Sequence, residues 1–169
     1  FEGGACELAN PLEASLEAKK LLECFRKNDL PIFHIQHINL VQPHINYLLP
    51  NTSGINIHKN VQPLSSEKII EKNFPNSFLQ TNLENELDKL NIKDVVICGM
   101  MSHMCVDATT RAAFDFGFSC ILAHNACTTK NIEFNNKVVL QKDVHYSFMS
   151  ALSNVYAQVQ TADEIISEF

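Results

Sequence analysis

The segment over residues 94–123 constrains the fold of this chain more than any other. Residues 94–98 (DVVIC) form a run of strand length, and residues 118–123 form a second apolar run. Between them, apolar side chains recur at helical spacing over residues 102–116, and Gly117 follows as a typical residue after a helix end. A strand, a helix and a strand in this order predict a right-handed crossover between two parallel strands.

Helices and strands are expected to alternate along the rest of the chain. Asn10 followed by Pro11 predicts the start of a helix that continues to about residue 29. Residues 41–66 contain three prolines and one glycine and are expected to form a long, mostly irregular loop. This alternation predicts a single α/β domain over residues 1–169, a Rossmann-like three-layer α/β/α sandwich with a mostly parallel sheet. The other expected elements are strands over residues 31–40, 68–72 and 156–160 and helices over residues 82–90, 143–153 and 162–169.

Composition narrows the classes of partner. The 169 residues are 46% hydrophobic and 19% charged, which is typical of a globular chain, and the net charge is −6. This acidic balance argues against nucleic acid and anionic membrane surfaces as partners, and no apolar stretch approaches the roughly 18 residues of a membrane span. Six cysteines without any C-x-x-C pair favour a reduced, cytoplasmic protein, with Cys98 and Cys120 buried in strands.

The turn over residues 99–105 is the first candidate for chemistry, because ligands of open α/β sheets bind at the carboxyl ends of strands. With Ser102 as N-cap, Cys105 falls in the first helical turn, where the positive helix end stabilises a thiolate. The unpaired N–H groups of the same turn can receive an oxyanion. The structural alternative is an inert cysteine packed in the turn.

A catalytic thiol also needs a base or a cationic neighbour. Seven histidines offer candidates, so a Cys–His pair stays open. His34 and His37 are three residues apart on a predicted strand and therefore point to opposite faces, which argues against a metal site and against a metal cofactor. By its spacing alone, Lys72 is expected to be a solvated surface residue.

Three segments resemble one known family, the isochorismatase-like cysteine hydrolases of the nicotinamidase/isochorismatase superfamily. Residues 99–117 (GMMSHMCVDATTRAAFDFG) resemble the family's cysteine signature, with a glycine after a strand, Cys-Val, and Arg-x-Ala in the helix. Residues 71–78 (EKNFPNSF) resemble its lysine segment. Residues 1–4 (FEGG) resemble the loop after its first strand, so the likeness covers nearly the whole chain.

The resemblance implies an Asp–Lys–Cys triad in which Cys105 is the nucleophile and Lys72 the lysine. The family's aspartate ends its first strand, and both are expected ahead of Phe1. The resemblance further implies a cis peptide between Met100 and Met101, which would aim the Met101 N–H beside that of Cys105 at an oxyanion. The nicotinamidase branch holds a metal through an Asp-x-His pattern that is not found near His37.

The residues and the resemblance together predict a cysteine-dependent hydrolase that cleaves a C–N bond of a small amide or carbamoyl compound through a thioester. The enzyme alternative is isochorismatase-type vinyl-ether hydrolysis, and the non-enzyme alternative is a degenerate binding or assembly member of the family. His37, Phe74 and Phe78 are expected to line the substrate pocket, together with Tyr47. The resemblance also implies a homodimer or a larger homo-oligomer, in which the loop over residues 41–66 could close a site across subunits.

Overall fold

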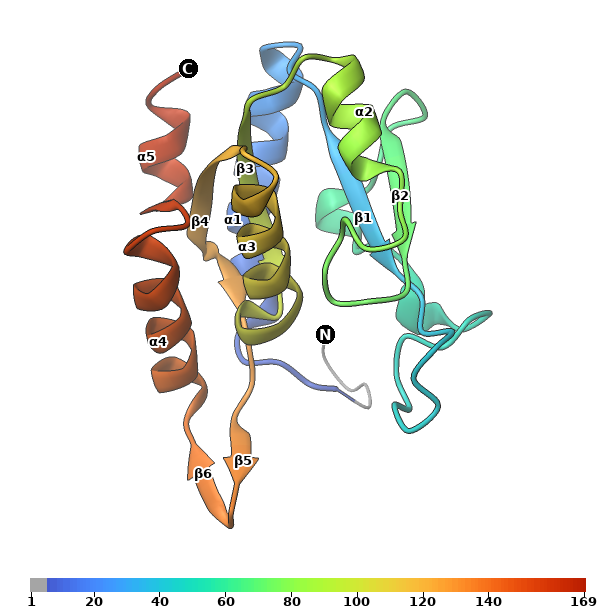
Figure 1. Ribbon diagram of the computed structural model, residues 1–169, viewed down its shortest axis with the longest axis vertical. Coiled ribbons are helices and arrows are strands. Elements are labelled where there is room, and N and C mark those ends of the chain that lie inside the picture. Colours follow the sequence, from blue (N-terminus) through green and yellow to red (C-terminus); the bar gives the residue numbers. More distant parts are fainter. Residues whose placement is uncertain (1–5) are drawn as a thin grey trace.

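The computed structural model of the protein describes residues 6–169, in which helices and parallel strands alternate (Figure 1). The expected strand over residues 68–72 is confirmed to the residue, and the helices have nearly the expected bounds. The order of elements is α1 (Pro11–Lys27), β1 (Phe33–His37), β2 (Lys68–Lys72), α2 (Leu83–Lys89), β3 (Asp94–Met100), α3 (Asp107–Asp115), β4 (Ser119–Thr128), β5 (Ile132–Phe134), β6 (Lys137–Val139), α4 (Gln141–Ser153), β7 (Gln158–Gln160) and α5 (Ala162–Ile166).

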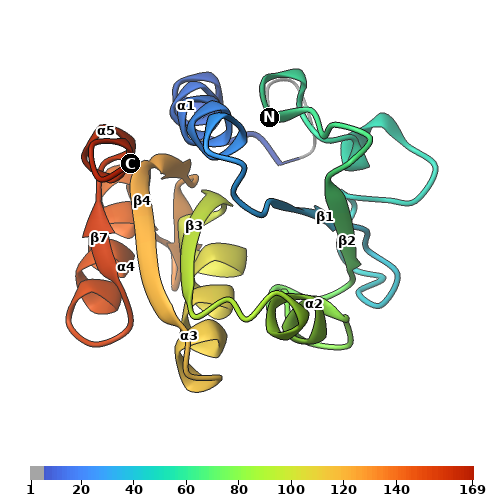
Figure 2. The same cartoon turned by 90° about the horizontal axis from the view of Figure 1, so that it is seen from above.

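The pairing of the strands confirms the α/β class. β1 pairs in parallel with β2, and β3, β4 and β7 form a second parallel sheet in that order. Seen from above, α1 and α5 lie on one side of these strands and α2 and α3 on the other (Figure 2). The crossover from β3 through α3 to β4 is the predicted strand–helix–strand unit. The arrows of both sheets point the same way in Figure 1, so the carboxyl ends of β1, β2 and β3 lie toward one functional edge.

Apolar packing holds the layers together. A cluster of buried side chains joins α2 and α3 to both sheets through Ile70, Leu87 and Phe118. A second cluster packs α1 and α5 against β4 around Ala123. Each buried Leu, Ile or Phe side chain contributes roughly 1.5–3 kcal/mol relative to an exposed one. These contacts hold α2 and α3 against both sheets and α1 and α5 against β4.

The two parallel sheets are separated by a slot between β1 and β3. A cavity of about 380 Å³ lies there, lined by residues of both strands and by side chains of α1 and α2. Cys98 of β3, which was expected in the core, borders this slot and is exposed to it within residues 6–169. Cys120, on the covered part of β4, is buried as expected. An extended segment in this slot would have the edge of β1 on one side and the edge of β3 on the other.

The hairpin formed by β5 and β6 was not expected from the sequence. Asn135 and Asn136 both have positive φ values, of 50° and 58°, and connect the two short antiparallel strands. A pair of left-handed residues is the mark of a tight hairpin turn, and asparagine tolerates this conformation better than most residues. The hairpin projects from the body at the end opposite to α5 (Figure 1).

Two further findings concern the cysteines and the helices of the described residues. All six cysteines are free thiols. No helix within residues 6–169 is long and apolar enough to cross a membrane. The segment over residues 1–4, which carries one part of the family resemblance, lies outside the described residues, as does the aspartate expected ahead of Phe1.

Candidate active site

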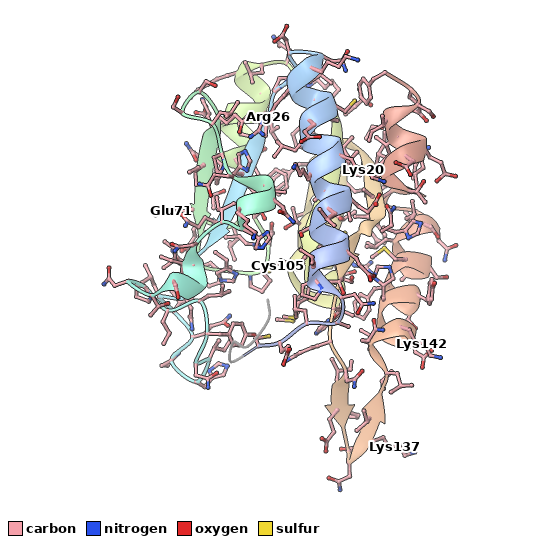
Figure 3. The ribbon with its side chains drawn as sticks, turned by 180° about the vertical axis from the view of Figure 1, so that it is seen from behind. Lys20, Arg26, Glu71, Cys105, Lys137 and Lys142 are labelled. Carbon is pink, nitrogen blue, oxygen red and sulfur yellow. The ribbon has the colours of Figure 1, made fainter. Side chains whose placement is uncertain are left out.

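The site is built where β3 ends. The peptide bond between Met100 and Met101 is cis, and residues Ser102–Val106 form a single wide helical turn before α3. In this turn the Val106 N–H bonds to the Met101 carbonyl, five residues back, at 3.3 Å. Wide turns of this kind occur frequently at functional sites. Cys105 lies in this turn, in the middle of the molecule between α1 and the β1–β2 pair (Figure 3).

Ser102 does not cap the helix, contrary to the expectation from the sequence. Met101 occupies the capping position, and the Ser102 side chain is fully buried. Its hydroxyl shares a hydrogen bond of 2.8 Å with Nδ1 of His145, which lies on α4. His103 in the same turn shares a hydrogen bond of 2.5 Å with the Thr129 hydroxyl. The turn is thus fixed by two pairs of side chains from distant parts of the chain.

His37, at the end of β1, lies against the sulfur of Cys105. Its Nδ1 atom is 3.7 Å from Sγ, within hydrogen-bonding distance for sulfur. Burial and the nearby Lys72 charge lower the pKa of His37 below its ordinary value, while a hydrogen bond to the Asn73 backbone acts in the opposite direction. The imidazole is therefore neutral at pH 7 and can accept a proton. Of the open alternatives, the Cys–His pair is present in the structure.

Lys72, at the end of β2, is buried rather than solvated, so the expectation from spacing alone is wrong. Its side chain belongs to a residue that is 4% exposed, and Nζ donates to the Pro75 carbonyl at 2.6 Å and to the Ser77 hydroxyl at 3.2 Å. Burial lowers the pKa of the Lys72 ammonium, whereas the charge of Cys105 and a hydrogen bond to it raise that pKa. The ammonium thus lies where it stabilises a Cys105 thiolate.

The lysine segment is fastened to the nucleophile helix through Ser77 and Thr109. The Ser77 N–H donates to the Thr109 hydroxyl at 3.1 Å, and the two hydroxyls share a hydrogen bond of 2.9 Å. Thr109 lies one helical turn after Cys105, so this contact sets the separation between lysine and sulfur. Arg111 of the same motif has a structural place: it pairs with Asp107 at 2.9 Å and lies over the Tyr156 ring.

A cavity of about 400 Å³ opens onto these groups. His37 and Tyr47 line it, as do Met101 and Cys105, whose N–H groups were assigned to an oxyanion by the resemblance. Phe74 and Phe78, which were expected to line the substrate pocket, are not among the residues that border this cavity. The Phe78 ring packs instead against Phe116 and Phe118, at 5.2 and 6.0 Å between ring centroids.

The two histidines of the H-x-x-H pattern go to different surroundings. Nε2 of His34 pairs with the Glu67 carboxylate at 2.7 Å, while His37 faces Cys105. Within residues 6–169, no three His, Cys, Asp or Glu side chains are grouped as a metal site requires. The described part of the chain thus presents a thiol, an imidazole and an ammonium around one cavity, which is an arrangement for nucleophilic attack.

Comparison with known proteins shows the family to which the chain belongs. Residues 2–164 match the Isochorismatase domain family, and the chain belongs to that family of hydrolases. It is 43% identical to the isochorismatase family protein YddQ of Bacillus subtilis over 98% of this chain and 92% of that protein. A crystal structure of an isochorismatase-family hydrolase from Oleispira antarctica superimposes with a TM-score of 0.93 at 41% identity, covering 99% of this chain and 88% of the other. Streptothricin hydrolase of Streptomyces noursei is 30% identical over 69% of this chain and 40% of its own length.

Proposed function

We propose that the protein is a cysteine-dependent hydrolase of a small amide or carbamoyl compound. The observation that carries this proposal is the position of the Cys105 sulfur, which borders an open cavity with His37 at 3.7 Å and the Lys72 ammonium beside it. Vinyl-ether hydrolysis requires acid catalysis and has no use for a nucleophilic thiol. The relative named streptothricin hydrolase supports the hydrolase class.

The first step is the formation of a thiolate. The neutral His37 imidazole accepts the Cys105 proton at Nδ1, and the buried Lys72 ammonium stabilises the negative sulfur. The family resemblance assigns this proton to an aspartate ahead of Phe1. Replacement of His37 distinguishes the two assignments, because activity falls if His37 is the base and is nearly unchanged if the aspartate is the base.

The second step is acyl transfer. The thiolate attacks the carbonyl carbon, the C=O electron pair moves to oxygen, and the N–H groups of Met101 and Cys105 bind the oxyanion. The tetrahedral adduct collapses as the C–N bond breaks, and the proton held on His37 passes to the nitrogen, which leaves as ammonia or an amine. Water then attacks the thioester, releasing the carboxylic acid and restoring the thiol.

The test is replacement of Cys105 by Ala and, separately, by Ser, with ammonia release from a panel of small amides as the readout. Both variants are expected to lose at least a thousandfold in turnover while keeping the circular dichroism spectrum and melting temperature of the parent. Turnover that survives both replacements would favour the vinyl-ether alternative. A parent protein that hydrolyses neither an amide nor isochorismate, and whose Cys105 reacts with iodoacetamide no faster than an ordinary thiol, would favour a binding or assembly role.

We also propose that the chain is a single domain whose sheet is continuous once an extended segment occupies the slot between β1 and β3. The support is the apolar lining of that slot and the parallel direction of the strands on either side. The strand expected ahead of Phe1, with its aspartate, fits this place. Unpaired backbone groups on facing strand edges would there find hydrogen-bond partners.

Self-association and location are two further proposals. The exposed apolar side chains of the β5–β6 hairpin, with Phe134 75% and Val138 61% exposed, support a homodimer or larger homo-oligomer. The six free thiols support a reducing, cytoplasmic location.

A further inference from the structure

The Cys105 cavity has one polar side and one mainly apolar side. The sulfur is bordered by His37 and Lys72, which are the polar machinery of the site. The long loop between β1 and β2 supplies a mainly apolar wall to the same cavity. Its lining residues include Ile45, Tyr47, Leu48, Ile55 and Ile57.

Two of the polar side chains that share this wall, Gln36 and Asn39, are occupied by the loop itself, while Gln42, Asn56 and His58 also line the cavity. Gln36 donates from Nε2 to the Ile55 carbonyl at 2.8 Å. Asn39 donates from Nδ2 to the carbonyls of Gln42 and Ile45 at 2.9 and 3.1 Å, and its Oδ1 accepts from the Gln42 N–H at 3.0 Å. These amides shape the loop, and their donors are engaged with backbone oxygen.

Lys72 is engaged in the same way. Its ammonium donates to the Pro75 carbonyl and the Ser77 hydroxyl and interacts with the Cys105 sulfur. The cation is thus fixed at the reacting end of the cavity. A substrate carboxylate lying against the apolar part of this wall would exchange its hydration for contact with isoleucine and leucine side chains, which is strongly unfavourable.

We propose that the substrates are uncharged amides with an apolar acyl group, whose carbonyl lies at Cys105 and whose hydrocarbon lies against the loop wall. This inference rests on the proposed function and names its substrate class. A cavity of about 400 Å³ exceeds the needs of acetamide. Each additional methylene buried against the wall therefore raises kcat/KM about fourfold, which corresponds to about 0.8 kcal/mol, until the cavity is filled.

The experiment compares matched amides. Ammonia release is measured with acetamide, butyramide and hexanamide, and with adipamate, in which a carboxylate replaces the terminal methyl of hexanamide. The expected result is a rise in kcat/KM along the neutral series and a value for adipamate at least a hundredfold below that of hexanamide. Equal rates for hexanamide and adipamate would overturn the inference while leaving the proposed function in place.

A second readout separates the two proposals when turnover is slow. The rate at which iodoacetamide alkylates Cys105 is measured with each amide present. Hexanamide is expected to protect the thiol at concentrations at least tenfold below those of adipamate, whether or not ammonia is released. Protection by hexanamide without turnover would contradict the proposed hydrolysis and support the preference of the pocket for an uncharged, apolar acyl group. Equal protection by both compounds would contradict that preference.

Replacement of Ile55 tests the wall directly. Ile55→Arg places a cation at the loop wall, and Ile55→Met is the matched neutral control. The arginine variant is expected to shift the ratio of adipamate to hexanamide protection at least tenfold towards adipamate, and the methionine variant to leave it within twofold of the parent. An unchanged ratio in an arginine variant with the parent's melting temperature would show that the substrate body lies elsewhere.

Discussion

Glu67 anchors the end of the pocket loop, and its replacement by Gln tests the electrostatic reasoning quantitatively. Its carboxylate accepts from Arg26 Nε and Nη2 at 2.7 and 2.8 Å, from the Leu64 N–H at 2.8 Å, and lies 2.7 Å from Nε2 of His34. The side chain is 8% exposed. The Arg26 hydrogen bonds are the main cause that lowers the pKa of Glu67 from 4.5 to about 2.

The lowered pKa translates into a free energy of unfolding. At about 1.4 kcal/mol per pH unit, ionised Glu67 contributes about 3 kcal/mol to stability at pH 7. Because the pKa is lower in the folded state, this contribution is complete above pH 4.5 and is lost as the pH falls from 4.5 towards 2. The Glu67→Gln variant keeps the shape of the side chain and removes the charge.

The assay is urea unfolding followed by far-ultraviolet circular dichroism, since the chain has no tryptophan. The parent and the variant are compared between pH 7 and pH 3. The expected difference is about 3 kcal/mol at pH 7 and narrows below pH 4.5. Glu23→Gln is the matched control, because the exposed Lys19–Glu23 pair contributes under about 1 kcal/mol. A Glu67 difference below about 0.5 kcal/mol at pH 7, or one independent of pH, would refute the reasoning.

Three other predictions concern the site and the hairpin. Because the pKa of His37 is lowered below 6.5, the acidic limb of the pH profile of kcat/KM is expected below pH 6.5. The His37→Gln variant is expected to lack that limb and to lose at least a hundredfold of activity. A variant with activity within threefold of the parent would assign the thiol proton to another base. Lys72→Met is expected to slow alkylation of Cys105 by iodoacetamide at pH 7 at least tenfold, and an unchanged rate would contradict the role of the ammonium. Phe134→Glu is expected to lower the mass measured by light scattering from that of an oligomer towards that of one chain, and a parent that is already monomeric would contradict self-association.

Much of the fold follows from local patterns in the sequence. The apolar run ending at Cys98 and the helical spacing before Gly117 predict the β3–α3–β4 crossover. The period and the length of an apolar pattern depend on whether the element is a strand or a helix and on which of its faces are buried. The exposure of Cys98 could not be predicted in this way. It depends on whether a neighbouring strand covers the β3 edge, which is a property of the sheet and not of the run itself.

The site was only partly predictable for the same physical reason. Cys105 is marked by its turn, and Lys72 by the family resemblance alone, because its burial results from Pro75 and Ser77 folding over it. The Ser102–His145 hydrogen bond joins residues 43 positions apart, and no local pattern indicates such a pair. Successive residues of a strand point to opposite faces, which predicts that the His34 and His37 side chains lie on opposite sides of β1. This alternation does not indicate that His37 contacts the Cys105 sulfur.

Acyl transfer to hydroxylamine tests the central claim most directly, because it reports a thioester even when that species does not accumulate. Hexanamide is turned over in the presence of hydroxylamine, and hexanoic acid and its hydroxamate are quantified together. We expect hydroxamate to form at the expense of the acid in the parent and neither product to form with Cys105→Ala. Turnover that yields acid alone at every hydroxylamine concentration, or that persists without the Cys105 thiol, would contradict covalent catalysis by this residue.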